Sequence, residues 1–242
     1  MNIKNNVHVG NYGNGRRDGA FWHQIQNAAY YGDGDNYLPW TSLDICAHEL
    51  GHGICQYTSN LAYTFGSESS ALNEGFSDIW GACVSFWAAP NKQHWLIGEE
   101  TCGSNNPPFL RSLIAPKTAF DPCADCYGSN TWIAYNDPHR RSGVLSKWFQ
   151  LLSDGGVGTN DLGNTYSVSG ITIDKAAKIA YLTEQLLTSN ADYEMARIMS
   201  IQAAIQIYGT NSCEEFSVKN AWYAVGLGTF NQPLNISIGI GV

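Results

Sequence analysis

Two short segments carry the side chains best suited to chemistry. The first is His48-Glu49-x-x-His52, and the second, residues 73–78 (Asn-Glu-Gly-Phe-Ser-Asp), places Glu74 twenty-six residues after the first histidine. On a helix, residues four apart lie on the same face, so both imidazoles can bind one metal ion while Glu49 lies beside them. The spacing therefore predicts a metal site.

Two surface histidines on an ordinary helix are the alternative interpretation. Residues 43–54 are largely apolar or small, which predicts a helix buried on most sides. Buried histidines and a buried glutamate need polar partners, and a metal ion supplies one. The surroundings of the motif therefore favour the metal.

Glu74 is the best candidate for the third ligand. Catalytic zinc takes three protein ligands and keeps a fourth position for water, whereas structural zinc is closed by four ligands, mostly cysteines. Residues 69–87 have apolar side chains at helical spacing, and Asp78, one turn after Glu74, can accept the free ring N–H of a ligand histidine. The alternative is that both carboxylates are helix N-terminal charges favoured by the helix dipole.

Local patterns predict how these residues are positioned. Residues 1 to about 42 are expected to form short strands and glycine turns, including the turn at 11–15. A metal-binding helix follows at about 43–57. The later helices are expected near 69–88, 143–153, 171–188, 192–208 and 213–225. The segments at 98–142 and 154–170 are predicted to be loops.

Composition limits the class of protein. The 242 residues are 44% hydrophobic and 12% aromatic, enough to bury a sizeable core. A net charge of −8 argues against nucleic acid and anionic membranes as partners, and Arg140-Arg141 is too short for a basic patch. No apolar run reaches the roughly 18 residues that a membrane span needs. We expect a monomer.

The chain resembles the thermolysin family of neutral zinc metallopeptidases over almost its whole length. Besides the two motifs, the resemblance includes 19–22, 30–35, 57–63, 110–112, 139–143 and 220–226. It implies an α+β, zincin-type, two-lobed fold with an active-site helix across the cleft. The expected division is a small β-containing N-terminal lobe at 1–62, a mainly α-helical lobe at 63–230 and a tail or linker at 231–242.

The same resemblance implies roles for the metal-site residues. His48, His52 and Glu74 bind zinc, Glu49 is the general base on the metal-bound water, and Asp78 supports a ligand histidine. Two further residues, Tyr63 and His139, match the family's donors to the oxyanion of the tetrahedral intermediate. Without the resemblance, Tyr63 would be interpreted as a packed aromatic residue.

Substrate contacts also follow from the resemblance. Arg111 matches the arginine that holds a substrate backbone carbonyl, although composition alone would favour a solvated surface cation. The backbone of Ala20 lies on the edge strand that pairs with an extended peptide. Gly19 replaces a family asparagine that contacts substrate, so weaker peptide affinity is expected. Asp137 is expected to orient His139 from a polar loop, at an offset that differs from the family's aspartate.

Calcium binding is expected to be lost or reduced. Asp44 and Glu99 stand at positions that match the family's double calcium site. The other carboxylates of that site, which calcium binds through several oxygens, are replaced by Ser85, His94 and Leu96.

Seven cysteines are unevenly placed. Three of them lie in apolar helical segments: Cys46, Cys55 and Cys83. They are interpreted either as buried thiols or as members of disulfides. Cys102, Cys123 and Cys126 lie in predicted loops, where a disulfide is the preferred interpretation over half of a zinc knuckle or a redox pair.

The start of the chain has two interpretations. Residues 1–6 lead into no apolar stretch of the kind a signal peptide needs, so a leader and a pro-segment are expected to be missing if the protein is secreted like its family. Only nineteen residues precede Ala20. Either the chain is a fragment, or its N-terminal lobe is shortened.

Three functions remain open at this point. The resemblance favours a zinc endopeptidase that cleaves extended peptide or protein substrates, with a bulky apolar residue just after the cleaved bond. The second is a catalytically impaired relative that binds zinc and acts as a peptide-binding or structural protein. An aminopeptidase is less favoured, because no carboxylate cluster suited to a substrate amine lies near the metal motif.

Overall fold

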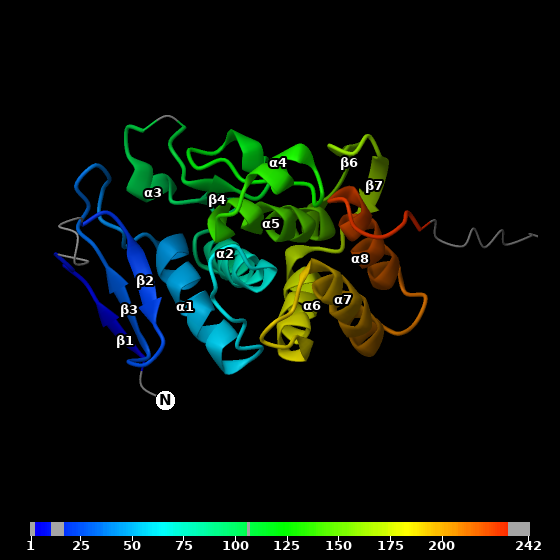
Figure 1. Ribbon diagram of the computed structural model, residues 1–242, viewed down its shortest axis with the longest axis horizontal. Helices are drawn as coiled ribbons and strands as arrows, with labels where there is room; N and C mark the ends of the chain where they lie inside the picture. Colours follow the sequence, from blue (N-terminus) through cyan, green and yellow to red (C-terminus); the bar gives the residue numbers. More distant parts are fainter. Residues whose placement is uncertain (1–2, 11–16, 106, 232–242) are drawn as a thin grey trace, which may run out of the picture.

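The computed structural model describes residues 3–10, 17–105 and 107–231, and it has two lobes (Figure 1). The first lobe holds a three-stranded sheet of β1 (Lys4–Asn6), β2 (Ala20–His23) and β3 (Ala28–Tyr31). Their order is β1-β3-β2, with β1 parallel and β2 antiparallel to β3. Within the described residues, β2 is therefore an edge strand, as expected.

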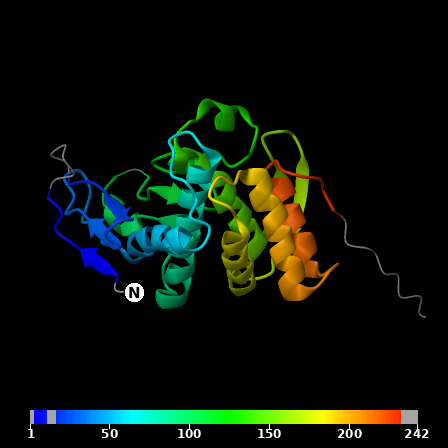
Figure 2. The ribbon, with the colours of Figure 1, turned by 60° about the horizontal axis from the view of Figure 1, so that its bottom comes forward.

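Helices make up most of the second lobe. The turned view in Figure 2 shows α6, α7 and α8 at the end opposite the sheet, so the predicted α+β architecture is confirmed. The long helices are α1 (Leu43–Tyr57), α2 (Glu68–Ala88), α5 (Pro138–Asp154), α6 (Ile173–Leu186), α7 (Tyr193–Tyr208) and α8 (Cys213–Ala224). All but α5 begin within two residues of their predicted starts.

Helices α1 and α2 pack side by side at two glycines. A Cβ atom on Gly51 would lie 2.8 Å from the Cα of Ser77, and one on Gly81 would lie 2.9 Å from the backbone oxygen of Asp44. Both distances are too short for any side chain. One glycine from each helix therefore permits the close approach that sets the histidines of α1 opposite Glu74 of α2.

The sheet is fixed to α1 through Trp22. Its indole lies over Gly53, where a Cβ atom would be 3.1 Å from the ring. The indole N–H donates to the Gln56 side chain at 2.7 Å. These contacts hold β2 alongside the helix that bears the two histidines.

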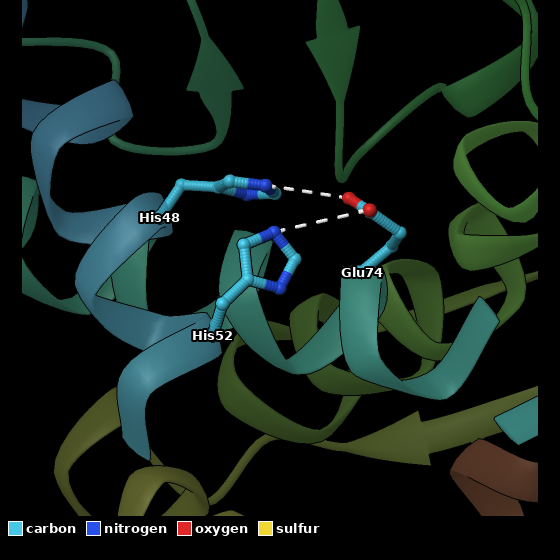
Figure 3. Close-up of side chains that lie close together, drawn as sticks. All are labelled: His48, His52 and Glu74. Carbon is cyan, nitrogen blue, oxygen red and sulfur yellow. Dashed lines mark ion pairs between the residues drawn. The ribbon is translucent and has the colours of Figure 1, made fainter. Parts of the chain in front are cut away.

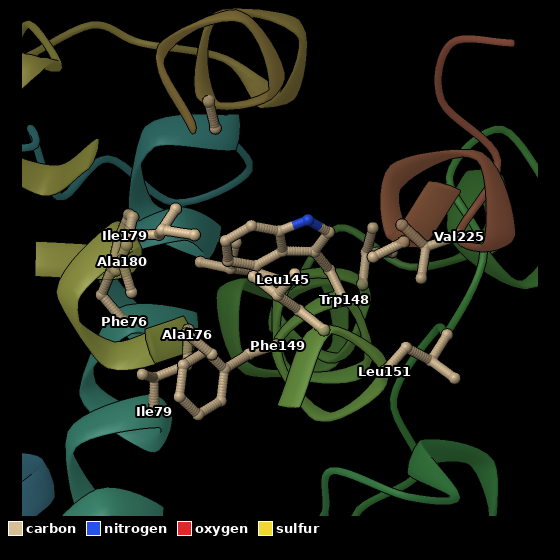
Figure 4. Close-up of a cluster of buried hydrophobic side chains, with 14 of the residues drawn as sticks. Phe76, Ile79, Leu145, Trp148, Phe149, Leu151, Ala176, Ile179, Ala180 and Val225 are labelled. Atoms are coloured by element: carbon tan, nitrogen blue, oxygen red, sulfur yellow. The ribbon is translucent and has the colours of Figure 1, made fainter. Parts of the chain in front are cut away.

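The main core fills the helical lobe. Trp148 and Phe149 of α5 are fully buried among side chains of α2 and α6 (Figure 4). The Trp148 ring stacks on Trp222 of α8 at 4.9 Å. A smaller cluster around Ile45 packs beneath the first lobe.

Shorter elements occupy the segments predicted as loops. They are β4 (Leu96–Ile97), α3 (Glu99–Cys102), β5 (Arg111–Ser112), the 3₁₀ turn η1 (Pro116–Thr118), α4 (Asn130–Ala134), β6 (Gly155–Thr159) and β7 (Thr165–Ser169). The loop prediction for 154–170 was therefore wrong. Strand β6 reads Gly-Gly-Val-Gly-Thr and has no alternating apolar pattern, so its pairing depends on β7, whose Val168 packs into the core.

Helix α5 begins five residues before the predicted start. Asp137 caps it by accepting from the backbone N–H groups of His139 and Arg140, and Pro138 occupies its first turn. These are favourable helix-start residues. His139 therefore lies on the first turn of α5, and its predicted position in a loop was wrong.

All seven cysteines are free, so the expected disulfide among the loop cysteines was wrong. Cys102 packs in the small cluster with Ile45. The Cys123 thiol instead donates to two backbone carbonyls, and Cys126 faces the carbonyl of Tyr127. Cys102 is therefore packed among apolar side chains, while Cys123 and Cys126 contact backbone carbonyls.

Two expectations fall on segments without a description. The glycine turn at 11–15 and most of the predicted tail at 231–242 lie outside the described residues. Among the described helices, none combines the length and apolar character that crossing a bilayer requires.

Glu184 of α6 is fully buried near the end of α1. One carboxyl oxygen accepts from the Trp80 indole at 3.1 Å, while Oε1 has no hydrogen-bond partner. Burial raises the pKa of this carboxyl to about 8, against the opposing hydrogen bonds from its neighbours. The folded protein therefore holds the proton at a pH where an exposed glutamate has lost it.

We predict that Glu184→Gln reduces the loss of stability at rising pH. Because only the unfolded chain releases the proton between its ordinary pKa of 4.5 and the folded value of about 8, the wild-type free energy of unfolding falls across that window. The free energy of unfolding of the variant should exceed that of wild type by a few kcal/mol at pH 8 and by little at pH 4.5. Urea unfolding of both proteins across this range measures the difference.

The matched surface control is Glu100→Gln, whose wild-type side chain is half exposed. Equal gains by Glu184→Gln at pH 4.5 and pH 8 would contradict the prediction, because a packing change alone does not depend on pH.

Candidate active site

The two histidines of α1 face one carboxylate of α2 (Figure 3). His48 Nε2 lies 3.3 Å from Glu74 Oε2, and His52 Nε2 lies 3.8 Å from Oε1. The imidazole rings are nearly perpendicular, with centroids 4.8 Å apart. All three candidate ligand atoms lie within 4.8 Å of one another, and among the described residues this is the one such group of three or more.

This geometry fits a tetrahedral metal ion. Ligand atoms bound at about 2.0 Å to such an ion lie about 3.3 Å apart, close to the separation of His48 Nε2 and Glu74 Oε2. Glu74 Oε2 is buried and makes no hydrogen bond, although it lies near two imidazoles. The atoms thus converge on a shared point, which is the arrangement of ligands around an ion.

The second nitrogen of each ring is held by α2. His48 Nδ1–H donates to Asp78 at 2.8 Å, and His52 Nδ1–H donates to the side-chain oxygen of Asn73 at 2.6 Å. Both bonds leave Nε2 free to bind a metal. Sequence reasoning named Asp78 but not Asn73, although its place next to Glu74 was a usable signal.

Arg111 of β5 forms a bidentate ion pair with Asp78. Its Nε and Nη2 each donate to a different carboxylate oxygen at 2.8 Å, and its side chain is 13% exposed. Despite burial, Arg111 and His48 together lower the pKa of Asp78 to about 2. Arg111 is therefore not a solvated surface cation, and its side chain is absent from the described lining of the cleft.

Glu49 lies next to the metal-binding group. Its carboxylate is buried, and Oε2 has no hydrogen-bond partner. Burial raises its pKa above the ordinary value, partly offset by the two histidines. A carboxylate with a raised pKa is a better proton acceptor than a fully solvated one.

Tyr63 and His139 contact the same carboxylate. The Tyr63 hydroxyl donates to Glu74 Oε1, and His139 Nε2 lies 3.4 Å from Glu74 Oε2. Asp137 Oδ1 lies 3.3 Å from His139 Nδ1 while it also caps α5. The structure thus brings the predicted Tyr63, His139 and Asp137 to the metal-binding group.

These side chains line one cavity of about 570 Å³ between the lobes. The lining includes residues of β2, α1 and α2 together with Tyr63 and His139. The lining residues are Ala20, Phe21, Trp22, His23, Gln24, Ile25, His48, Glu49, His52, Tyr63, Asn73, Glu74 and His139.

The predicted calcium residues lie apart from this group. Asp44 Oδ2 accepts from the backbone N–H of Gly98 at 2.6 Å. Burial raises the pKa of Glu99, and the nearby Asp44 charge adds to the shift. No cluster of three or more His, Cys, Asp or Glu ligand groups in the described part of the chain includes either residue.

Two histidines on one helix, a glutamate from the next helix and a cleft bordered by β2, the edge strand of the described sheet, define the two-lobed, zincin-type class of proteins. Comparisons with known sequences agree. A family profile described as thermolysin metallopeptidase, alpha-helical domain, matches residues 59–227, and one for the catalytic domain matches 1–56. The chain belongs to the thermolysin family of metallopeptidases.

Individual relatives show the extent of the match. A transglutaminase-activating metalloprotease of Streptomyces mobaraensis is 36% identical over 92% of this chain and 29% of its own length. Bacillolysin of Bacillus caldolyticus is 38% identical over 93% of this chain and 40% of its own length. The chain thus spans less than half of either relative. The solved precursor of protealysin, a metalloproteinase from Serratia proteamaculans, aligns with a TM-score of 0.74 at 27% identity, over 93% of this chain and 69% of that one.

We predict that Asp78→Asn weakens metal binding. Loss of the charge that orients His48 should lower the affinity for Zn²⁺ about 10- to 100-fold. The buried guanidinium of Arg111 also loses its counter-charge, which should destabilise the metal-free protein by roughly 3 kcal/mol. Competition with a chromophoric chelator measures affinity, and urea unfolding measures stability.

Asp174→Asn is the matched control, because Asp174 pairs with an exposed tryptophan outside the site. An unchanged Zn²⁺ affinity in Asp78→Asn would contradict the proposed support of His48.

Proposed function

We propose that this protein is a zinc-dependent endopeptidase that hydrolyses internal bonds of extended peptide or protein substrates. The observation that carries the proposal is the convergence of His48, His52 and Glu74 beside Glu49, whose Oε2 has no hydrogen-bond partner. Two imidazoles and one carboxylate are a donor set typical of catalytic zinc. When bound there, zinc supplies Lewis-acid polarisation of the substrate carbonyl and lowers the pKa of a bound water.

Glu49 moves the protons of this reaction. Its free Oε2 accepts the proton of the attacking water, and the same carboxylic acid then protonates the leaving amine. Burial raises the pKa of Glu49 above its ordinary value, which makes its carboxylate a stronger base.

Tyr63 and His139 are proposed to stabilise the oxyanion. Both residues line the cavity and contact Glu74. Substrate binding would turn their O–H and N–H groups to the developing negative charge. One donor of this kind typically contributes about 3 kcal/mol to the barrier reduction.

Peptide binding is proposed to follow the edge of β2. The backbone of Ala20 lies at the cavity, and an extended peptide can add to the sheet there by main-chain hydrogen bonds. Arg111 is proposed to hold a substrate backbone carbonyl, with its guanidinium oriented by the ion pair with Asp78.

Several broader expectations are part of the same proposal. The chain divides into a lobe at 1–62, a helical lobe at 63–230 and a tail at 231–242, and it acts as a monomer. Secretion is inferred from the family, and Asp44 with Glu99 are the candidates for any calcium site. The proposed partners include neither nucleic acid nor membrane, in keeping with the negative net charge.

We predict that Glu49→Gln abolishes hydrolysis but preserves metal binding. Glutamine keeps the size of the side chain and cannot accept the proton, so kcat should fall at least 10²- to 10⁴-fold. A quenched fluorescent peptide with blocked ends measures the rate, and a metal titration confirms that the variant still binds Zn²⁺.

Wild-type cleavage should stop when a chelator is added and return with Zn²⁺. Chelator-resistant cleavage, or no cleavage by zinc-loaded wild type, would refute the endopeptidase proposal. Cleavage of free but not of blocked peptides would favour an aminopeptidase.

We predict that Asp137→Asn slows catalysis with little loss of stability. Asparagine caps a helix about as well as aspartate, but it lacks the charge that supports a cationic His139. We expect kcat to fall roughly tenfold, whereas Asp137→Ala also loses the cap and about 1 kcal/mol of stability. Peptide kinetics and urea unfolding separate the two effects.

The decisive comparison uses the His139→Ala background. There, Asp137→Asn should cause no further loss of kcat if it acts through the imidazole. An equal loss in both backgrounds would show that Asp137 acts by another route.

A further inference from the structure

The cavity extends past the metal-binding group to a turn with no role in the proposed reaction. His23 ends β2, and Gln24 and Ile25 follow it and line the same cavity. The Ile25 side chain is 90% exposed, although it borders the cleft. Water therefore covers a large apolar side chain at a place that a bound peptide can reach.

This turn is held in a fixed shape by the last turn of α1. Gln56 Nε2 donates to the backbone oxygen of Gln24 at 3.2 Å and to the Asn27 side chain at 3.3 Å. The Tyr57 hydroxyl donates to the same side chain at 2.5 Å. Asn27, which has a positive φ of 49°, also donates its backbone N–H to the oxygen of Gln24. The position of Ile25 is thus set before any ligand binds.

Contacts along α1 place the turn relative to the metal-binding group. Trp22 lies over Gly53, the residue directly after His52. Ala20 pairs with Tyr31 of β3, and Tyr31 lies near Cys46 in the first part of α1. The turn of α1 from His48 to His52 therefore lies beside the part of β2 between Ala20 and Trp22. At about 3.3 Å per residue, Ile25 lies roughly two to four residues along an extended peptide from the cleaved bond.

We propose that Ile25 is a specificity-determining residue that receives an apolar side chain of the substrate, two to four residues to one side of the cleaved bond. The inference rests on the proposed peptidase function. An apolar substrate side chain would cover Ile25 and remove both surfaces from water, whereas a polar one would lose hydration there. Because the turn is already ordered, little of this gain is lost to ordering the protein.

The test uses pairs of blocked, quenched peptides that differ only by Leu or Asn at one position. That position is scanned over roughly four residues on each side of the cleaved bond. Zinc-loaded wild type, Ile25→Asn and Val157→Asn are compared. Val157 is 80% exposed on β6 and absent from the cavity lining, so it controls for loss of a surface apolar residue.

The readout is the ratio of kcat/KM for each Leu and Asn pair, which cancels any difference in the folded fraction of a variant. We expect wild type and Val157→Asn to favour Leu about tenfold at one position two to four residues from the bond, and Ile25→Asn to lose that preference. Binding of the same peptide pair to the Glu49→Gln variant, with and without Ile25→Asn, should show the same difference in Kd.

Two results would overturn the proposal. One is an unchanged ratio in Ile25→Asn, and the other is a wild type without any preference at these positions. If wild type shows no chelator-sensitive cleavage, the proposed peptidase function fails, and the proposal for Ile25 fails with it. If wild type cleaves but the ratio does not depend on Ile25, only the proposal for Ile25 fails.

Discussion

The close contact of α1 with α2 is the constraint on which the site depends. Gly51 and Gly81 remove the side chains that would hold these helices apart. At this separation two imidazoles of one helix and a carboxylate of the other reach a common point. A methyl group at either glycine would push the helices apart and open the ligand set. The backbone contact is therefore as much a part of the metal site as the ligands, although neither glycine has a side chain to bind anything.

Buried charge is the second theme, and Asp78 is its centre. This carboxylate accepts from His48 on one side and from Arg111 on the other. A buried carboxylate is costly unless it is paired and hydrogen-bonded, and here both requirements are met by residues from two other elements, α1 and β5. Glu184 is the contrasting case, because it has no cation and keeps its proton instead. Burial thus has two different outcomes in this protein. Asp78 stays charged between His48 and Arg111, whereas Glu184 stays protonated.

The cleft itself combines a rigid floor with an open wall. Long helices carry the candidate ligands, while β2, the edge strand of the sheet among the described residues, borders the cavity. In the proposed binding of a peptide along β2, main-chain hydrogen bonds would not distinguish the side chains of the peptide. Selectivity must then come from side chains at the rim. Ile25, on a turn anchored by Gln56 and Tyr57, is placed for that purpose.

The sequence by itself determined the local features of this protein. Helical spacing indicated α1 and α2, the third ligand and Asp78, because one-turn periodicity is visible in a single segment. It did not reveal the start of α5 at Pro138, the β6–β7 hairpin or the free state of the loop cysteines. Those features depend on partners distant in sequence: β7 supplies the pairing that glycine-rich β6 does not signal, and backbone carbonyls occupy the Cys123 thiol. Likewise, only the tertiary structure placed Arg111 on Asp78 and Asn73 on His52, because hydrogen bonds between separate elements leave no periodic trace in the chain.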